Sequence, residues 1–568
     1  MTQIGDCGGW ENPHPFRTKR VRHPGSIVFV VSFVLILSSG ANTSAFGQSG
    51  NRVAGIVVND ADGTPLGRTR VALAEVQDRR RAESIVTGAD GRFEFSNVPA
   101  GKFSLEGWRR KFLPTSYQWH EGFSTAIVTG AGLDTENLVL RMIPLGSIAG
   151  KVVDETGEPV RDARMRLYFR NEQFGQDRIT TRQFANTDDE GKYEFEGLIP
   201  GEYFVSAVAR PWYAVYPGFI DENGVRTRVE TVAPELNVAY PATFYNGATE
   251  TESATPISVE KGARVTADIH VSPVPALHVT IKARGNVENG SAMWPTLERA
   301  EFDSPTPYHM EMIPGANPGE MEVNGLLPGR YSIAEPSRNG IVLGVGQVDL
   351  TKDAQVIEAK APEAMGTVKV KLKTARGEDV PQSMHLSLRN EKRKTIAFID
   401  VARMGETVFE GVPAGKYSVL VNVHQPPQYT IGKMVVQGAE IEGNDITVGE
   451  GATVEVDATL MAGVVSVEGI VKKDGKPVSG VMVALVPKDP RGHPERFRRD
   501  QSDLDGTFTV GGILPGTYTL IAVEDAWGTP WMKEGVLEKY LPKGQQLTIG
   551  VMMNSKVVLP EALEAQAK

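Results

Sequence analysis

Short stretches in which apolar and polar residues alternate recur along the chain after residue 50. The clearest are pairs of large apolar residues two positions apart: Phe93 and Phe95, Tyr193 and Phe195, and Phe508 and Val510. Because successive side chains of a strand point to opposite faces, this period of two predicts strands with one buried and one solvated face. The pattern therefore predicts an all-β protein.

A Pro-Gly-aromatic element follows such stretches five times. Its copies are Val98-Pro99-Ala100-Gly101-Lys102-Phe103, Ile199-Pro200-Gly201-Glu202-Tyr203, Leu327-Pro328-Gly329-Arg330-Tyr331, Val412-Pro413-Ala414-Gly415-Lys416-Tyr417 and Leu514-Pro515-Gly516-Thr517-Tyr518. Pro and Gly together favour a tight connection between two strands. The glycines lie roughly 100 residues apart, the size of a small β-sandwich. The repeat predicts about five tandem sandwiches.

An upstream half-motif accompanies three of these copies. It begins with Gly55-Ile56-Val57, Gly150-Lys151-Val152 and Gly469-Ile470-Val471, each followed by a Gly- and Pro-containing turn. A second turn precedes the aromatic strand at Asp90-Gly91, Glu190-Gly191 and Asp505-Gly506. Such dipeptides favour hairpins. Modules one, two and five thus carry both halves, whereas three and four keep only the Pro-Gly-Tyr half.

The combined pattern G-x-V-x-D-x-x-G-x-P, T-x-x-D-G-x-F-x-F and P-x-G-x-Y-x-L resembles the carboxypeptidase regulatory-like domain. The resemblance implies prealbumin-like Greek-key sandwiches of seven strands, related to the B-type repeats of collagen adhesins and to carbohydrate-binding-like folds. The predicted organisation is a signal peptide at 1–47, sandwiches at 51–143, 144–274, 275–363, 364–461 and 462–559, and a tail at 560–568. Sandwich 2 holds an aromatic insertion, and sandwiches 3 and 4 are degenerate.

The N-terminus has the features of an export signal. A basic stretch precedes an apolar run from Ile27 to Leu37, and Ala45-Phe46-Gly47 forms a small-x-small cleavage site. The run is shorter than the roughly 20 residues that span a bilayer. We expect cleavage before Gln48, with retention of the segment as an anchor as the alternative. The predicted location is secreted, periplasmic or at the cell envelope.

Composition narrows the possible partners. The formal net charge is -10, which argues against nucleic acid because phosphate binding needs a basic surface. The single cysteine, Cys7, precedes the apolar run and is lost on cleavage, so the mature chain has no disulfide. After residue 47 no segment is apolar and long enough to predict a membrane span.

Catalytic motifs are missing from the sequence. A zinc peptidase of the kind that the family name suggests needs a His-x-x-Glu pair and a distant His, but none of the nine histidines has Glu three residues later. A G-x-S-x-G elbow is also absent. The sequence predicts a non-catalytic protein without a cofactor or metal.

Two alternatives concern small sites. Asp60 and Asp62, like Asp503 and Asp505, have the two-residue spacing of part of a calcium loop, although Asp before Gly is also what a hairpin turn selects. Some collagen-adhesin repeats, which this pattern resembles, carry an internal isopeptide bond promoted by a Glu in the pattern Y-x-[IL]-x-E. Only Glu335 matches that Glu, with Lys282 as the donor and no matching Asn acceptor.

Aromatic-rich insertions follow three of the Pro-Gly-aromatic strands and hold the candidate ligand-binding residues. These are Trp108, Trp119, Trp212, Tyr213, Tyr216, Trp527 and Trp531. Exposed rings would stack on the apolar face of a sugar, whereas buried rings would seal the end of a sandwich or a junction between modules. The sequence leaves both interpretations open.

The leading functional hypothesis is an extracytoplasmic interaction or scaffold protein, a rod of modules placed end to end that contacts a glycan or an envelope protein. A carbohydrate-binding protein that uses the aromatic loops is the first alternative. A regulatory partner of an exported peptidase is the second, and it rests on family analogy, which does not establish function.

Overall fold

The computed structural model describes residues 50–568 with internal gaps, and the predicted signal peptide at 1–47 lies outside the described residues. The gaps are 131, 174–175, 217, 221–225, 229–231, 284–295, 303, 308–310, 316, 337–341, 359–364, 376, 378–379, 382–383, 392–394, 402–405, 424–427, 443, 464, 491–495, 532, 534 and 551–555.

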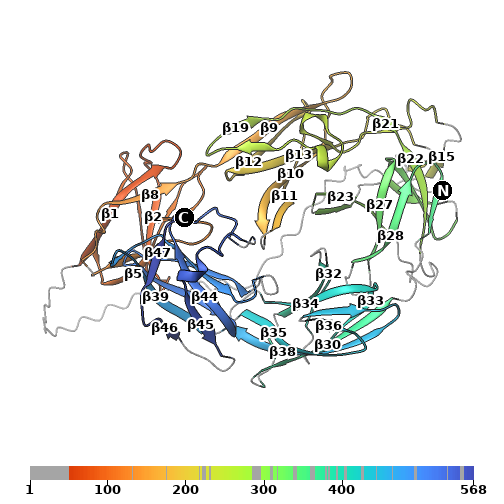
Figure 1. The fold of residues 1–568 in the computed structure, drawn as a ribbon. Coiled ribbons are helices and arrows are strands. Elements are labelled where there is room, and N and C mark those ends of the chain that lie inside the picture. Colours follow the sequence, from red (N-terminus) through yellow and green to blue (C-terminus); the bar gives the residue numbers. More distant parts are fainter. Residues whose placement is uncertain are drawn as a thin grey trace, which may run out of the picture. The chain divides into compact units, whose positions relative to one another are not determined.

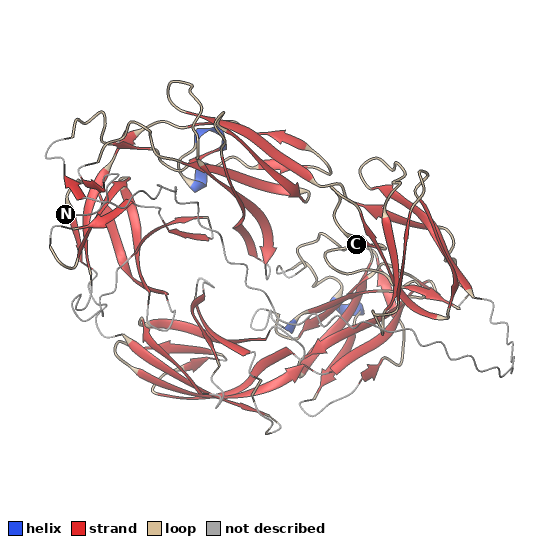
Figure 2. Cartoon of the chain, turned by 180° about the vertical axis from the view of Figure 1, so that it is seen from behind, coloured by secondary structure: helices blue, strands red, loops and turns tan. Residues whose placement is uncertain are grey.

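Nearly all regular structure in the described residues is β-strand (Figures 1 and 2). The helical elements described are short 3-10 turns, Tyr245–Gly247, Thr251–Ser253 and Leu541–Lys543. A search of the described part of the chain found no helix with the length and apolar character needed to cross a membrane. The all-β prediction is confirmed.

Module 1 consists of two sheets with a simple strand order. One sheet has the order β4-β1-β8, and the other has β3-β2-β5 with β6 and β7 also paired to β5. β1 is antiparallel to β4 and parallel to β8. The strands are β1 (Asn51–Asn59), β2 (Arg70–Glu75), β3 (Ala82–Val86), β4 (Arg92–Val98), β5 (Gly101–Trp108), β6 (Thr115–Ser116), β7 (Ile127–Thr129) and β8 (Leu138–Met142).

Module 2 repeats this plan and adds an insertion. β9 is antiparallel to β12 and parallel to β19 and β20, while β10 lies between β11 and β13. The strands are β9 (Gly146–Val153), β10 (Arg164–Gln173), β11 (Gln176–Asn186), β12 (Lys192–Leu198), β13 (Gly201–Val208), β14 (Gly218–Ile220), β15 (Arg226–Arg228), β16 (Val238–Ala239), β17 (Thr243–Phe244), β18 (Ile257–Val259), β19 (Arg264–Thr266), β20 (Ile269–His270) and β21 (Val274–Pro275).

Modules 3 and 4 have the same topology, although their sequences keep only half of the motif. In module 3, β22 lies between β26 and β29, and β23 between β24 and β27. In module 4, β30 lies between β33 and β38, and β31 between β32 and β34. The strands are β22 (Leu277–Lys282), β23 (Thr296–Glu301), β24 (Ser304–Pro307), β25 (Glu311–Pro314), β26 (Glu320–Leu326), β27 (Gly329–Pro336), β28 (Val342–Leu350), β29 (Gln355–Glu358), β30 (Gly366–Thr374), β31 (Met384–Asn390), β32 (Thr395–Asp400), β33 (Glu406–Val412), β34 (Gly415–Val423), β35 (Gln428–Gln437), β36 (Ile441–Glu442), β37 (Asp445–Val448) and β38 (Thr453–Gly463).

Module 5 extends further than expected. Its last strand, β47, pairs with β39 and β44, and Leu563 and Ala565 are buried in its core. The predicted tail at 560–568 is therefore wrong, because alternating apolar residues in it complete the sandwich. The strands are β39 (Val465–Lys473), β40 (Lys476–Pro477), β41 (Met482–Pro487), β42 (Arg498–Gln501), β43 (Thr507–Ile513), β44 (Gly516–Val523), β45 (Gln545–Ile549), β46 (Lys556–Val558) and β47 (Leu563–Gln566).

Five separate clusters of buried apolar residues account for the stability of the five modules. Each cluster draws its buried residues from one module, and the apolar pairs of the alternating stretches belong to the clusters of modules 1, 2 and 5. β4 and β12 even show the same sequence of buried and exposed positions. The tandem β-sandwich architecture is confirmed, while the residue at which each module begins stays a prediction.

The glycine of the upstream half-motif is required by close packing. A Cβ on Gly150 would lie 2.1 Å from the carbonyl oxygen of Ala267 in the neighbouring parallel segment. A Cβ on Gly55 would meet the carbonyl oxygen of Leu138 at the same distance. Any larger side chain would separate the first and last strands of the sheet, which explains the glycine at this position.

A buried hydroxyl braces the Pro-Gly turn of every module. In four modules the tyrosine two residues after the glycine donates to the carbonyl four residues before itself: Tyr203 to Ile199 (2.7 Å), Tyr331 to Leu327 (2.9 Å), Tyr417 to Pro413 (2.9 Å) and Tyr518 to Leu514 (2.6 Å). Module 1 has Phe103 instead, and there Thr129 Oγ1 donates to the equivalent carbonyl of Pro99 at 2.6 Å. In modules 2 to 5 the aromatic residue of the motif thus fixes the turn as well as filling the core.

Modules 2 and 3 meet through a buried ion pair. Arg166 Nη1 donates to Glu301 Oε2 at 2.7 Å, and the Tyr168 hydroxyl donates to the same oxygen. The ring of the next residue, Phe302, packs against Tyr168 and Phe244. Because the carboxylate is enclosed, its two partners compensate most of its desolvation.

Candidate binding site

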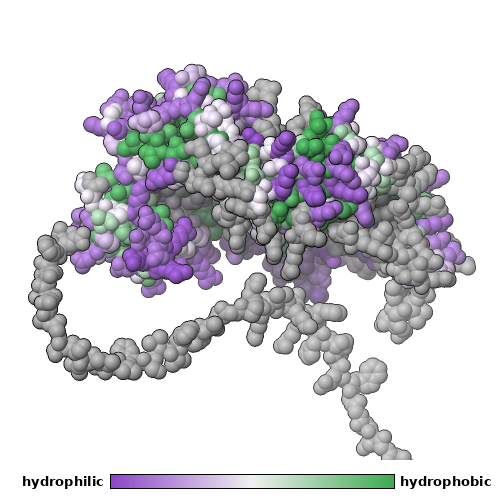
Figure 3. All heavy atoms as spheres, turned by 90° about the horizontal axis from the view of Figure 1, so that it is seen from below, coloured by the Kyte–Doolittle hydropathy of each residue, from purple (hydrophilic) through white to green (hydrophobic). Residues whose placement is uncertain are grey.

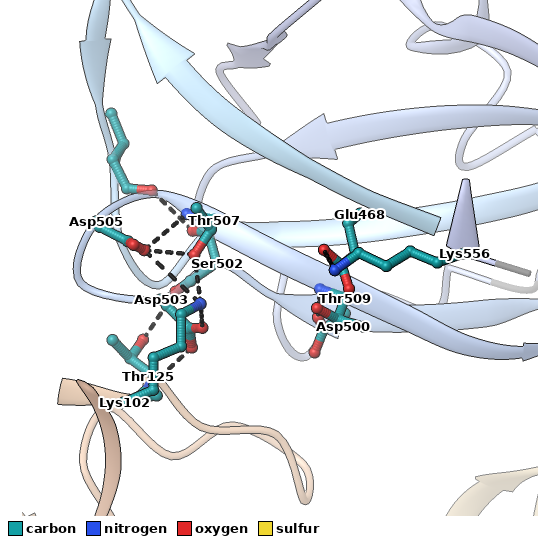
Figure 4. Close-up of polar contacts among 12 residues, drawn as sticks. Lys102, Thr125, Glu468, Asp500, Ser502, Asp503, Asp505, Thr507, Thr509 and Lys556 are labelled. Atoms are coloured by element: carbon teal, nitrogen blue, oxygen red, sulfur yellow. Dashed lines mark hydrogen bonds and ion pairs between the residues drawn. The ribbon is translucent and has the colours of Figure 1, made fainter. Parts of the chain in front are cut away.

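The first and last modules are in direct contact, which contradicts the expectation of modules placed end to end. Lys102, the residue after the turn glycine of module 1, donates from Nζ to Asp503 Oδ2 and to Thr507 Oγ1, both at 2.5 Å (Figure 4). The backbone N–H of Leu504 donates to the Ala126 carbonyl at 3.1 Å. A loop of module 5 and a loop of module 1 are therefore complementary in hydrogen bonding.

This loop of module 5 is the Asp-Gly turn that the sequence singled out. Asp505 accepts hydrogen bonds from Thr507, as in a hairpin turn, and Asp503 Oδ1 accepts from the N–H of Ala126 at 2.9 Å. The carboxylates therefore face a lysine and backbone donors. Among the described residues, no group of three His, Cys, Asp or Glu is arranged to hold a metal ion.

A buried amide extends the contact. Gln501 is 1% exposed, and its Nε2 donates to the Gln118 carbonyl at 2.7 Å and to Thr125 Oγ1 at 2.8 Å. Its Oε1 lies 2.9 Å from His120 Nδ1. Because buried polar groups are costly without partners, this fully bonded amide favours one arrangement of the two modules.

Aromatic rings cover the other side of the contact. The rings of His120 and Trp527 are stacked, with centroids 5.1 Å apart and planes 6° apart. Arg499 lies over Trp531 at 4.2 Å and donates to Glu121 Oε2 at 2.8 Å. The guanidinium thus has an ionic partner and a ring face, an arrangement that favours Arg over Lys.

Burial raises the pKa of two carboxyl groups near the contact, Asp500 and Asp503. Desolvation raises the pKa of Asp500 to about 6, although the N–H of Thr509 donates to it at 2.6 Å (Figure 4). Desolvation also raises the pKa of Asp503, against the opposing effect of Lys102. Burial is the largest cause of both shifts, as expected for carboxyl groups enclosed by packing.

A cleft of about 600 Å³ opens beside this contact. One wall is the module 1 insertion from Thr115 to Glu121, and the opposite wall is Trp527 and Gly528 of module 5. The outward side chains around β8, including Arg141, form a further side, and the ion pair between Lys261 and Asp60 (2.7 Å) adds module 2. Its volume is in the range of small-molecule sites.

Two of the predicted aromatic residues, Trp119 and Trp527, line this cleft together. Trp527 is held on both sides, since its Nε1 donates to the Gly480 carbonyl at 3.0 Å and its ring stacks on His120. Trp119 is partly exposed and makes no ring contact or hydrogen bond with the described residues. Trp119 is therefore the tryptophan of this cleft that is open to a ligand among the described residues.

Three other predicted residues have partners within the protein. Trp531 packs on Phe497 at a centroid distance of 5.2 Å and seals the end of module 5. Trp108 has Arg70 over its ring at 4.4 Å. Tyr216 is 4% exposed and packs at the junction between modules 2 and 3, where its position favours the sealing interpretation.

The remaining two lie together on module 2, outside the residues that line the cleft. Trp212 is 83% exposed and meets Tyr213 edge to face at 5.7 Å. The Tyr213 and Tyr240 hydroxyls both donate to the carboxylate of Glu155. These contacts hold Tyr213 firmly under an exposed tryptophan. On the face that Figure 3 shows, hydrophilic and hydrophobic residues of the described surface are intermixed.

The sequence did not reveal several residues of the site. Gln501, Arg499 and Lys102 are polar residues on or beside strands and resemble ordinary solvated positions. Arg141 carries one available signal, because alternation in β8 places it on the outer face. The other three join the two modules through partners that lie 376 to 405 residues away.

No protein-family model matches the chain, and no curated protein is similar to it in sequence. Among solved structures, the Bacillus anthracis TIE protein is 12% identical over 74% of this chain and 75% of its own, with a TM-score of 0.17. The minor pilin of Streptococcus agalactiae is 14% identical over 39% of this chain and 96% of its own (0.21). The shaft pilin SpaA from Lactobacillus rhamnosus GG is 10% identical over 39% and 97% (0.19). Scores this low add nothing to the topology described above.

Proposed function

We propose that the chain is a non-catalytic, extracytoplasmic interaction protein in which a constant β-sandwich framework presents variable loops for binding. The observation that carries this proposal is that the strands are alike in all modules while the insertions and turns differ between them. The strand order and the hydroxyl brace recur in all five modules, whereas the aromatic and charged residues of the cleft lie mainly on insertions and turns. Such a scaffold tolerates loop change without loss of fold.

The chemistry of the cleft supports binding over catalysis. Its histidine stacks on Trp527 and contacts a glutamine, so it has no adjacent nucleophile to activate. Its acidic residues, Asp60 and Glu121, are paired with Lys261 and Arg499. General acid–base chemistry needs a group poised to exchange a proton with substrate, and these groups are committed to partners.

Export and envelope location form part of the proposal. The basic and apolar N-terminal pattern supports secretion, and the motif pattern supports a carboxypeptidase regulatory-like ancestry. Carbohydrate binding is a second candidate function, and the observation that favours it is the open ring of Trp119 in the cleft.

Envelope retention tests the proposed function. Residues 48–568 carrying a fluorescent label are incubated with cell envelopes of the source organism, before and after enzymatic removal of their polysaccharides. The expected result is saturable retention without chemical change to the envelope. Absence of saturable retention on both preparations contradicts the proposed interaction role, and release of new fragments from the envelope contradicts the non-catalytic assignment.

A further inference from the structure

We infer that the cleft between modules 1 and 5 binds an acidic oligosaccharide, with a sugar face on Trp119 and a carboxylate on Arg141. This inference rests on the proposed binding function and names its ligand class. Both side chains line the same cleft, and both lie on module 1. The argument depends on which groups of the cleft are already satisfied and which are not.

Trp119 supplies the stacking surface. The faces of an indole ring carry negative charge density, and the C–H groups on one face of a pyranose ring are complementary to it. Trp527, on the opposite wall, is occupied by His120 and Phe123. Trp119 is the cleft tryptophan without such neighbours among the described residues, so a bound ring would complete its packing.

Arg141 supplies the charge. It is exposed at the edge strand β8 and has no ion-pair or hydrogen-bond partner in the part of the chain that the structure describes. The charges of the acidic residues in the cleft are balanced by ion pairs, since Asp60 pairs with Lys261 and Glu121 pairs with Arg499. The cleft therefore has one uncompensated cation, and a guanidinium binds a carboxylate through two parallel hydrogen bonds.

The rest of the lining suits a hydroxyl-rich ligand. Gln118, Asn137 and the two paired carboxylates place amide and carboxylate oxygens around an opening of about 600 Å³. Hydroxyl groups can both donate to and accept from such side chains. A short saccharide matches both the size and the polarity of this lining.

The modules must meet for this site to exist. Trp527 and Gly528 form their wall only because the N–H of Gly528 donates to Glu121 at 2.9 Å and Trp527 stacks on His120. A preformed wall lowers the entropy cost of binding. Changes that separate modules 1 and 5 should therefore weaken the sugar site without touching Trp119.

Calorimetry on residues 48–568 tests the inference with two probes, trigalacturonate and its neutral carboxyl-reduced trimer. Trp119→Ala should reduce the affinity for both trimers at least tenfold. Arg141→Gln should reduce only the affinity for the acidic trimer, by about tenfold, and should abolish its preference over the neutral one. Phe184→Ala and Arg164→Gln, which change an exposed aromatic residue and an exposed strand arginine elsewhere, should leave both affinities unchanged.

Three results overturn the inference. They are failure of trigalacturonate to bind, unchanged affinity in Trp119→Ala, and displacement of the acidic trimer by an acidic peptide that binds more tightly at the same cleft. If envelope retention persists in any of these cases, the interaction role stands and only the ligand class is wrong. If retention is lost as well, the proposed function fails with it.

Discussion

The hydroxyl brace of the Pro-Gly turn gives a prediction that can be worked from the structure. Tyr203→Phe removes one oxygen atom from a ring that is 0% exposed and packs on Phe169. The Ile199 carbonyl then loses the donor at 2.7 Å, and no other described residue donates to it. A buried acceptor without a partner costs about 1–3 kcal/mol, part of which the added apolar character offsets. We expect module 2 to lose about 1–2 kcal/mol.

Hydrogen exchange measured by mass spectrometry can localise this loss. A chain of five modules does not unfold in one step, so a single melting temperature would mix their contributions. We expect exchange in peptides from β12 and β13 to quicken roughly 5- to 30-fold, the factor that corresponds to 1–2 kcal/mol. Peptides from modules 4 and 5 should be unchanged.

Two further variants separate the hydroxyl brace from general effects of the substitution. Tyr429→Phe removes a hydroxyl that makes no hydrogen bond with the described residues, and it should have no effect on protection in module 4. Thr129→Val should destabilise module 1 as Tyr203→Phe destabilises module 2, because Thr129 supplies the equivalent donor. Unchanged exchange in both Tyr203→Phe and Thr129→Val would refute the reasoning.

Three more predictions concern the junctions and the buried acid. Lys102→Met should leave the Asp503 carboxylate without its cation and weaken the contact of modules 1 and 5 by about 1–3 kcal/mol, seen as a broader distance between spin labels on the two modules. Glu301→Gln should leave the buried Arg166 without its anionic partner. The junction of modules 2 and 3 should then be destabilised by about 3–5 kcal/mol, which hydrogen exchange would detect. Asp500 has a folded pKa of about 6, above its ordinary value of 3.8, so its stabilising effect is present below about pH 4 and is lost as the pH rises through 6. Asp500→Asn should remove that loss, seen by calorimetry from pH 4 to 7.

Matched changes serve as controls for these three. Lys371→Met removes an exposed strand lysine of module 4 and should leave the spin-label distance unchanged. Glu298→Gln alters a carboxylate on the same strand as Glu301 and should cost far less. A stability difference between Asp500→Asn and the parent that stays constant over the pH range would contradict the pKa argument.

The sequence was sufficient to predict the modules because the information for each sandwich is local. Alternation placed Tyr193 and Phe195 in a core, and the Pro-Gly element marked where β12 and β13 are joined. The burial of β47 was missed because its apolar residues, Leu563 and Ala565, form too short a pattern. The partners of Lys102 could not be predicted, since nothing in the local pattern distinguishes a solvated lysine from one that meets another module.

The position after the turn glycine shows how one framework gives two outcomes. In modules 2 and 3 this residue pairs within its own sheet, Glu202 with Arg170 at 2.9 Å and Arg330 with Asp349 at 2.8 Å. In module 1 the same position holds Lys102, whose partners lie on module 5. At this position a side chain that pairs within its own sheet makes no link to another module, whereas Lys102 links module 1 to module 5 beside the cleft. The contact between modules 1 and 5 therefore depends in part on a repeat position that the core pattern leaves free to vary.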